Sequence, residues 1–369
     1  MHVFYVSLPW IIDEKEYNCS SRSYSEWVGR GSVNPFQGTY FGVSGLIFVV
    51  LYGLCLTGMV RGHLLKITCY RLMFFNGIVD IIDLAVGSFL TAYFHFTGAV
   101  FCSTMAINWI AGHLSWSAWC GATFNCVVLA LNRTIEMNPA MQRLRFLFKG
   151  KAPFFWMFFC VLYMIVRPFI SGPIPYNTVV SSYLGAPMIS DDIEWEISNY
   201  ASLFLPIHNL IVSVILVTLY AFLCHQVMKI RRASTGRMDK VQIQLFMQSL
   251  LICATTAMTA ILYSFLDFFP VSRSIVIAGN VVWQLSHGVH GVVYLCFNSH
   301  IRGQVLALLT RGILVQPGHP RDHISGRGLG LLPGDPSKFS VQPKPFRGHG
   351  TTPSDPRDFG ETTGDHREF

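Results

Sequence analysis

Two carboxylates and two histidines interrupt long uncharged segments of the sequence, where ionisable side chains are costly. Asp80 and Asp83 lie in the segment 72–94, and His287 and His290 lie in the segment 274–297. In a helix, a spacing of three residues puts both members of a pair on one face. Acids and bases inside apolar helices are rare and usually functional, so these four side chains are the first candidates for a functional cluster.

The depths of these side chains along their helices match. At about 1.5 Å per residue, Asp80 and Asp83 lie roughly 14 and 18 Å from Arg71. His290 lies roughly 18 Å from Arg302 by the same measure. We therefore predict that Asp80 or Asp83 hydrogen-bonds His290 across a helix bundle, with Tyr294 nearby. The predicted cluster, here called the polar latch, comprises Asp80, Asp83, His287, His290, Tyr294 and Asn298.

Two roles for the polar latch remain open from the sequence. It could rearrange when the protein changes conformation, with bound water or sodium, or it could be a static clamp that only fixes helix packing. A membrane zinc hydrolase is a further alternative, because His287 and His290 with Asp80 form part of a metal-ligand set. A third ligand is not evident, since His95 and His113 lie nearer the opposite end, and we expect no metal and no cofactor.

Aromatic and polar side chains also gather in the outer halves of several segments. Such a set could line a pocket for a small, largely apolar ligand. The alternative is that its members face lipid or fill the core. The candidate ligand-binding residues are Trp109, His113, Trp116, His208, Tyr263, Trp283 and Gln284.

Seven apolar segments position these residues. A bilayer core of about 30 Å needs about 20 helical residues, and lipid does not tolerate unpaired backbone amides. The chain is 51% hydrophobic and 13% charged, so we predict an all-α membrane protein with a seven-helix bundle. Arg167, near one end of the fourth segment, is expected to extend toward the outer headgroups. The predicted spans are 39–60, 72–94, 103–131, 154–170, 200–224, 243–265 and 274–297.

The connections between the spans predict the orientation. Lys and Arg gather after the first, third and fifth spans, whereas the segment 171–199 has neither and is acidic. Short basic loops stay in the cytoplasm, so we expect an extracellular tail at 1–38, the membrane domain at 39–305 and a disordered cytoplasmic tail at 306–369. The net charge of +7 follows mostly from this sidedness and from a basic tail, and no nucleic-acid partner is expected.

Three residues on the predicted outer side carry modification chemistry. Cys19 and Cys102 are the two of the ten cysteines expected outside, so a disulfide could tie the tail to the third span. Asn18 begins the sequon Asn18-Cys19-Ser20 and is a candidate glycosylation site.

Several motifs give the chain a family resemblance. It resembles the nematode serpentine receptor class T (Srt) family over about residues 35–305. The likeness is carried by MFFNGIVD at 73–80, LALNR at 129–133, FKGK at 148–151, QSLLIC at 248–253, WQLSHG at 283–288 and YLCFN at 294–298. The resemblance implies a G-protein-coupled chemoreceptor in the plasma membrane of sensory cells. Such a receptor would bind an external small molecule, signal to a heterotrimeric G protein and catalyse no reaction itself.

The inner end of the third span departs from the wider rhodopsin-like pattern. The usual Asp-Arg-Tyr triplet is Asn132-Arg133-Thr134 here, and Glu136 could replace the missing acid. Gln244 and Gln248 are candidate resting partners of Arg133. The alternative is that Arg133 only anchors a helix end at the interface. The expected coupling residues are Arg133, Glu136, Arg231 and Arg232.

Two other membrane functions compete with the receptor. A retinal pigment is excluded, because the seventh span contains no lysine. A channel or transporter would be expected to show internal repeats or interrupted helices near the middle of the membrane, and the sequence indicates neither.

Overall fold

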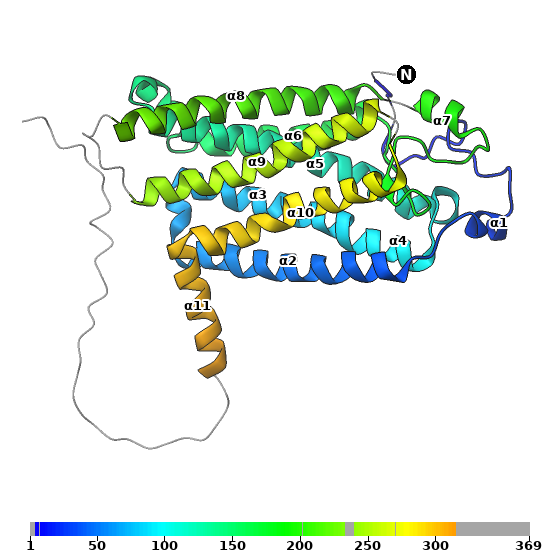
Figure 1. Cartoon of the computed structure of the whole chain (residues 1–369), viewed down its shortest axis with the longest axis horizontal. Helices are drawn as coiled ribbons and strands as arrows, with labels where there is room; N and C mark the ends of the chain where they lie inside the picture. The colour runs from blue at the N-terminus through cyan, green and yellow to red at the C-terminus, as the bar shows by residue number, and fades with distance from the viewer. Residues whose placement is uncertain (1–3, 7, 201, 233–239, 270, 315–369) are drawn as a thin grey trace, which may run out of the picture. The chain divides into compact units, whose positions relative to one another are not determined.

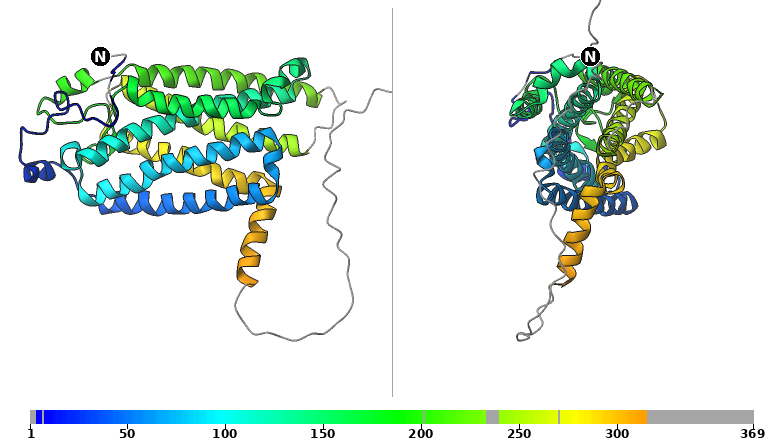
Figure 2. Two further views of the ribbon diagram at one scale, coloured as in Figure 1. Left: turned by 180° about the vertical axis from the view of Figure 1, so that it is seen from behind. Right: turned by 90° about the vertical axis from the view of Figure 1, so that its left-hand side faces the viewer.

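The structure is a computed structural model whose described residues are 4–6, 8–200, 202–232, 240–269 and 271–314. Its long helices run side by side (Figure 1, Figure 2). Six helices are long and apolar enough to cross a membrane, and a seventh span results when α10 is taken together with α11. The predicted seven-helix bundle is confirmed. The spans are α2 (Pro35–Arg61), α3 to α4 (Thr68–Thr97), α5 (Met105–Met137), α6 (Ala152–Ile170), α8 (Phe204–Arg232), α9 (Lys240–Phe268) and α10 (Arg273–Phe297).

The composition of a helix explains whether it lies at the centre or at the edge of the bundle. Within the most apolar 18 residues of α5, 78% are buried, against 17% for α6. The third span is rich in small and polar residues that pack against neighbouring helices, whereas the fourth exposes phenylalanines such as Phe155 and Phe158. Helix α5 is therefore the core of the bundle, and α6 presents a face that suits lipid.

The second span is not a continuous α-helix. It consists of α3 (Thr68–Leu84), a π-helical segment η2 (Ala85–Leu90) and α4 (Thr91–Thr97). A π-helical turn alters the i→i−4 hydrogen-bonding pattern, and such turns often mark functional sites. The carbonyl of Val86 accepts hydrogen bonds from Thr91 Oγ1 at 3.1 Å and from Tyr183 Oη at 3.2 Å. This interruption begins two residues after Asp83 and is absent from the sequence prediction.

Short elements cover the end of the bundle that we expect to be extracellular. They are α1 (Tyr24–Gly29), η3 (Phe101–Ser103), the two-stranded antiparallel hairpin β1 (Tyr176–Asn177) and β2 (Ser182–Tyr183), and α7 (Ile193–Tyr200). In the hairpin, Tyr176 pairs with Tyr183. Tyr17 and Trp27 of the amino-terminal segment are buried, so the expected tail packs onto the bundle.

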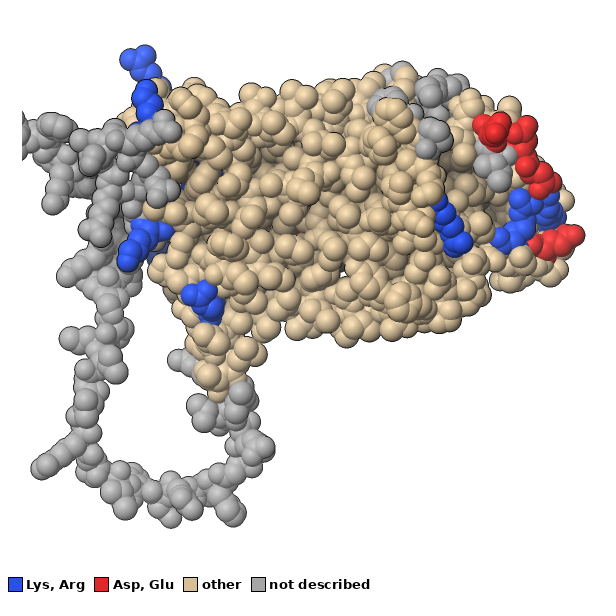
Figure 3. All heavy atoms as spheres, viewed as in Figure 1, with Lys and Arg blue, Asp and Glu red and all other residues tan. Residues whose placement is uncertain are grey.

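Charged contacts join the amino-terminal segment to the segment before α7. Arg22 and Arg30 both form ion pairs with Asp191. Hydrogen bonds from Arg30 and Arg22 lower the pKa of the Asp191 carboxyl. Figure 3 shows acidic and basic side chains together at this end, and Lys and Arg at the other end. The middle of the bundle surface in this view carries no charge, as a span in lipid requires.

The opposite end contains η1 (Leu64–Lys66), η4 (Pro139–Phe148) and α11 (Ser299–Leu314). Helix α11 turns away from α10 by 92° (Figure 1). Asn298 makes this corner, because its Oδ1 accepts the amide N–H groups of His300 and Ile301, each at 3.1 Å. Residues 306–314 are helical, although we expected disorder from 306, and residues 315–369 lie outside the described part.

Candidate functional site

Asp80 is the centre of a fully buried hydrogen-bonded cluster. Its Oδ1 lies 2.7 Å from Nδ1 of His287, and its Oδ2 lies 3.0 Å from Nδ1 of His290. Oδ2 also accepts from Tyr52 Oη and Asn76 Nδ2, each at 2.7 Å. An ionised carboxylate only accepts, so both histidines then carry a proton on Nδ1. The cross-bundle contact between Asp80 and His290 that the helix depths predicted is present.

Asp83 is close to the cluster but poorly satisfied. Its Oδ2 lies 3.4 Å from Nε2 of His287, and neither carboxyl oxygen has a hydrogen-bond partner among the described residues. His287 Nε2 likewise has none there. His290 is better satisfied, since its Nε2 lies 3.1 Å from Thr255 Oγ1 on α9. Within the polar latch, both oxygens of Asp80 are therefore hydrogen-bonded to described residues, whereas those of Asp83 are not.

The remaining predicted latch residues belong to a second group nearer α11. Tyr294 donates to the Met73 carbonyl at 3.1 Å, and its ring contacts Tyr52. Asn298 donates to Tyr70 Oη at 2.5 Å and to Gln248 Oε1 at 3.1 Å. Neither side chain hydrogen-bonds Asp80 or Asp83, so the predicted latch is divided between two groups.

A cavity of about 90 Å³ opens in the half of the bundle that carries the β1–β2 hairpin. Three of the predicted ligand-binding residues, Trp116, Tyr263 and Trp283, line it. The wall is mostly aromatic and aliphatic with a few polar groups, as is typical of sites for small organic molecules. The complete lining is Ser115, Trp116, Trp119, Ile174, Tyr183, Leu184, Gly185, Leu205, Asn209, Tyr263 and Trp283.

Two predicted ligand residues on α5 and one on α8 do not line this cavity. Trp109 Nε1 donates to the Pro9 carbonyl at 2.8 Å, beneath the amino-terminal segment. His113 lies edge-on against Trp109. His208 contacts the edge of Trp116, and its two ring nitrogens hydrogen-bond Thr123 and Tyr163. The prediction that these three line the pocket is wrong for this structure.

Gln284 faces away from the cavity. Its Nε2 donates to Ser44 Oγ and Ser88 Oγ, each at 2.8 Å, and to the Phe41 carbonyl at 3.2 Å. These contacts join α10 to α2 and to the π-helical segment. Gln284 thus holds helices together and does not line the pocket.

The sequence prediction missed three polar contributors to the cavity. Trp119 Nε1 donates to Asn209 Oδ1 at 2.9 Å, which links α5 to α8. Tyr183 reaches the cavity from the hairpin and donates to the Val86 carbonyl. Trp119 could have been found, because it lies three residues after Trp116 on the same helix face. Tyr183 and Asn209 had no comparable signal.

Two indoles connect the cavity to the polar latch. The rings of Trp119 and Trp283 both line the cavity and both lie edge to face with the His287 imidazole, with centroid distances of 5.7 and 6.2 Å. His287 in turn hydrogen-bonds Asp80. A change in the position of either indole therefore acts directly on the ring that Asp80 holds.

Arg167 points inward, so the expectation that it extends toward the headgroups is wrong. Its side chain is fully buried. Nη2 donates to the Gly172 carbonyl at 2.7 Å, Nη1 lies 3.3 Å from His113 Nδ1, and Cζ lies 4.9 Å from the Trp116 ring centre. Interior acceptors and an aromatic face replace the headgroup contact that hydropathy alone suggested.

Arg133, at the inner end of α5, is almost completely buried. It donates to Asn132 Oδ1 at 2.7 Å and to Gln242 Oε1 at 3.4 Å. The expected acidic partner, Glu136, instead lies 3.9 Å from Arg145.

The other expected partners of Arg133 are also engaged elsewhere. Gln244 donates to Ser299 at 3.3 Å and Gln248 accepts from Asn298, so neither holds Arg133. The side chains of Arg231 and Arg232 lie outside the described part of the structure.

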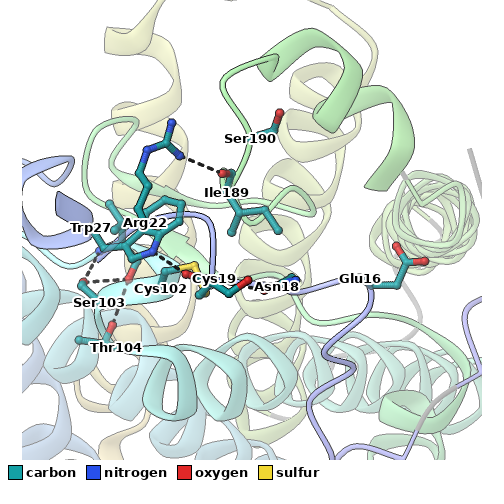
Figure 4. The surroundings of a disulfide bond; sticks show 12 residues. Glu16, Asn18, Cys19, Arg22, Trp27, Cys102, Ser103, Thr104, Ile189 and Ser190 are labelled. Carbon is teal, nitrogen blue, oxygen red and sulfur yellow. Dashed lines mark hydrogen bonds between the residues drawn. A yellow bond between two sulfur atoms is a disulfide. The ribbon is translucent and has the colours of Figure 1, made fainter. Parts of the chain in front are cut away.

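A disulfide joins Cys19 to Cys102 (Figure 4). It ties the amino-terminal segment to η3, as the sequence allowed. Trp27 Nε1 donates to the Cys19 carbonyl at 2.9 Å. Asn18 is exposed beside the bridge, which is compatible with its being a glycosylation site.

The alternative functions receive no support from the site. Within the described residues, no group of three or more His, Cys, Asp or Glu side chains could hold a metal ion. His287 and Asp80 thus lack the further ligands that a zinc hydrolase needs, and nothing in the cavity or the latch supports a channel.

Comparisons with known proteins agree with this geometry. The serpentine receptor class T-55 of Caenorhabditis elegans is 27% identical over 302 residues, which cover 79% of this chain and 80% of that protein. Squid rhodopsin has the same fold, with a TM-score of 0.54 and 12% identity over 85% of this chain and 93% of that chain. The family model of the serpentine seven-transmembrane GPCR chemoreceptors of class Srt matches residues 1–316. The chain is a member of this Srt family and a GPCR-like membrane receptor.

Proposed function

We propose that this receptor binds an external small molecule in the aromatic cavity and transmits its presence through the polar latch to a heterotrimeric G protein. The observation that carries the proposal is the shared contact of Trp119 and Trp283 with His287. These indoles form part of the cavity wall, and His287 is bonded to Asp80. Binding that favours one arrangement of the indoles would shift the population of receptor conformations.

The coupling end of this path is Arg133. In the structure it is held by Asn132 and Gln242, two neutral partners, and no ion pair forms between Arg133 and a described acid. Each partner offers an amide oxygen but no negative charge, so these bonds lack the attraction between full opposite charges that a carboxylate partner would add. Outward movement of α9, which carries Gln242, would release Arg133 toward the cytoplasmic partner.

The orientation of the receptor is part of the proposal. The end with the disulfide and the acidic segment before α7 would face outward, and the end with α11 would face the cytosol, as the positive-inside rule requires. The receptor would then lie in the plasma membrane of a sensory cell, with Asn18 available for glycosylation. Epitope tags placed before Pro35 and after Arg302 should label on opposite sides of intact cells.

A ligand screen tests the function. Cells would express the full chain with a promiscuous G protein, and the Arg133→Ala variant would serve as the coupling control. We expect a dose-dependent response in the wild type that the variant loses while its surface expression persists. A response that survives the substitution would remove Arg133 from the coupling path.

A cavity variant tests the binding site. Trp283→Ala should raise the ligand concentration needed for half response, and it should lower the maximal response without abolishing it, because the indole also contacts His287. Tyr93→Ala is a matched control, because Tyr93 is an exposed aromatic residue on α4 that does not line the cavity. An equal effect of both changes would show that the cavity is not the binding site.

A further inference from the structure

Arg167 is a buried cation without a counter-charge. None of the described acidic side chains lies within 4.0 Å of its guanidinium nitrogens, and its side chain has no exposed surface. The guanidinium group remains protonated in proteins and offers five N–H donors. Among the described residues, only the Gly172 carbonyl and His113 Nδ1 accept from it, and Nε has no hydrogen-bond partner there. A buried charge in this state is unfavourable unless something else pairs with it.

His113, which contacts Arg167, carries a second unsatisfied donor on the side of its ring that faces away from the guanidinium. Because Arg167 can only donate, Nδ1 of His113 must accept, and the imidazole proton then lies on Nε2. That Nε2 atom is buried and has no hydrogen-bond partner among the described residues. Two contacting side chains therefore each present a buried N–H group that lacks an acceptor. A carboxylate supplies two acceptor oxygens and the negative charge.

These donors adjoin the ligand cavity. Trp116 lines the cavity, and the Arg167 guanidinium carbon lies 4.9 Å from the centre of the same indole. Ile174, another lining residue, follows Gly172 by two positions, and its amide donates to the Gly112 carbonyl next to His113. The wall at this end of the cavity is thus built from the same segments that hold the unpaired cation.

We infer that the ligand of this receptor is a small organic acid whose carboxylate pairs with Arg167 while its apolar body occupies the aromatic cavity. The inference deepens the proposed function and rests on it, because it assigns a chemical class to the ligand of the same cavity. The carboxylate would replace the Trp116 indole beside the guanidinium, since a charge-assisted hydrogen bond is stronger than a cation–π contact. This differs from the largely apolar ligand that the sequence suggested.

Direct binding tests the charge of the ligand. The full-length receptor in nanodiscs would be melted with phenylacetate or octanoate, and with the uncharged analogues phenylacetamide and octanol. We expect the acids to raise the Tm and the neutral analogues to have little effect. The acid concentration needed for half of this shift should rise about tenfold or more in Arg167→Met, which loses charged hydrogen bonds.

Arg71→Met is the matched control. Arg71 also donates to a backbone carbonyl, that of Gly150, and also lies over an aromatic ring, that of Phe154, but it is at the other end of the bundle. The acid-dependent shift should be retained in this variant. Without ligand, Arg167→Met should melt at the same temperature as the wild type or higher, because the change removes an unpaired buried charge.

Several outcomes would overturn the inference. These are equal shifts by acids and neutral analogues, an acid shift that survives in Arg167→Met, no acid shift in the wild type, or a large loss of Tm in the empty variant. If Arg167→Met does not fold, Arg167→Lys decides, since it retains the charge but not the guanidinium fork and should also weaken acid binding. Neutral analogues that stabilise the wild type would leave the proposed function intact while refuting the carboxylate.

Discussion

Replacing Asp80 by Asn distinguishes a switch from a clamp. The carboxylate receives four hydrogen bonds, three of them at Oδ2 and one at Oδ1. An Asn side chain can place its oxygen where Oδ2 lies and keep the first three. Its amide group then faces Nδ1 of His287, so two donors meet unless the imidazole proton moves to Nε2, which faces Asp83. The substitution thus removes a charge and one acceptor without changing the size of the side chain.

The size of the effect follows from these contacts. Two opposed buried donors cost about 1–3 kcal/mol. The other three bonds lose their charge assistance, and buried membrane hydrogen bonds are worth about 0.6 kcal/mol each on average. A total near 2 kcal/mol corresponds to a change of about thirtyfold in an equilibrium constant. If the cluster exists in only one receptor conformation, the whole change appears in the equilibrium between conformations.

Two measurements on the same cells separate the roles. A switch predicts that Asp80→Asn alters basal signalling per surface receptor, while flow cytometry of an amino-terminal tag shows nearly normal expression. A clamp predicts equal loss of expression and signal, with a lower Tm and unchanged signal per receptor. The substitution adds no new favourable contact, so a variant with wild-type Tm and wild-type signalling would show that the hydrogen bonds of Asp80 are neither a switch nor a clamp.

Asp83→Asn is the matched control, because it makes the same change on the same helix face. Neither oxygen of Asp83 accepts a hydrogen bond from a described residue, so the substitution removes no such bond. We expect its Tm to equal or exceed that of the wild type. Destabilisation as large as that of Asp80→Asn would mean that Asp83 has partners beyond the protein itself, such as bound water or a cation.

Three further predictions concern other parts of the molecule. Removing the disulfide with Cys19→Ser should cost about 2–5 kcal/mol of stability and lower surface expression, whereas an unchanged Tm would show that the bridge is dispensable. Gly87→Ala should weaken the ligand response, because the added Cβ would lie 3.1 Å from the Trp283 ring and push it into the cavity. Gly53→Ala, with no atom within 4 Å of its Cβ, should not. Burial raises the pKa of Glu196 above its usual 4.5, so the neutral acid is favoured in the folded state. Wild-type stability relative to Glu196→Gln should fall as pH rises through the raised pKa, and a constant difference would contradict this.

The sequence predicted the long-range contact of Asp80 because depth in a helix is a simple product of rise and residue number. The direction in which a side chain points around its helix was harder to predict from the sequence. Gln284 was assigned to the pocket beside Trp283, yet adjacent residues on a helix point about 100° apart. Trp283 therefore faces the cavity while Gln284 faces α2. Tyr52 was missed because α2 is apolar around its circumference and no pattern marks its inward face.

The same difficulty in predicting side-chain direction explains why the predicted partners of Arg133 were wrong. Gln242 and Gln244 lie two residues apart and so point to nearly opposite sides of α9. The first faces Arg133, and the second faces Ser299. Hydropathy also predicted the depth of Arg167 in the membrane but not the direction of its side chain. The atoms that accept its hydrogen bonds lie on other segments. The π-helical segment has no sequence signature of this kind.

The cavity has two independent connections to the acidic residues of the second span. Trp119 and Trp283 contact His287, which hydrogen-bonds Asp80. Tyr183 also lines the cavity, and it donates to the Val86 carbonyl in the π-helical segment that begins two residues after Asp83. A π-helical turn can return to α-helical geometry by a small shift of register, which would rotate the residues on one side of it relative to the other.

Ligand contact with Tyr183 could therefore change the orientation of Asp83, while contact with the indoles changes the position of His287. Both movements act on the 3.4 Å separation between Asp83 Oδ2 and His287 Nε2, the least satisfied contact of the latch. Weakly satisfied polar contacts are the ones a modest binding energy can rearrange, since little is lost when they separate. Tyr183→Phe, which removes only the hydroxyl, should therefore reduce the maximal response more than Trp283→Ala does, although it removes far less of the cavity wall.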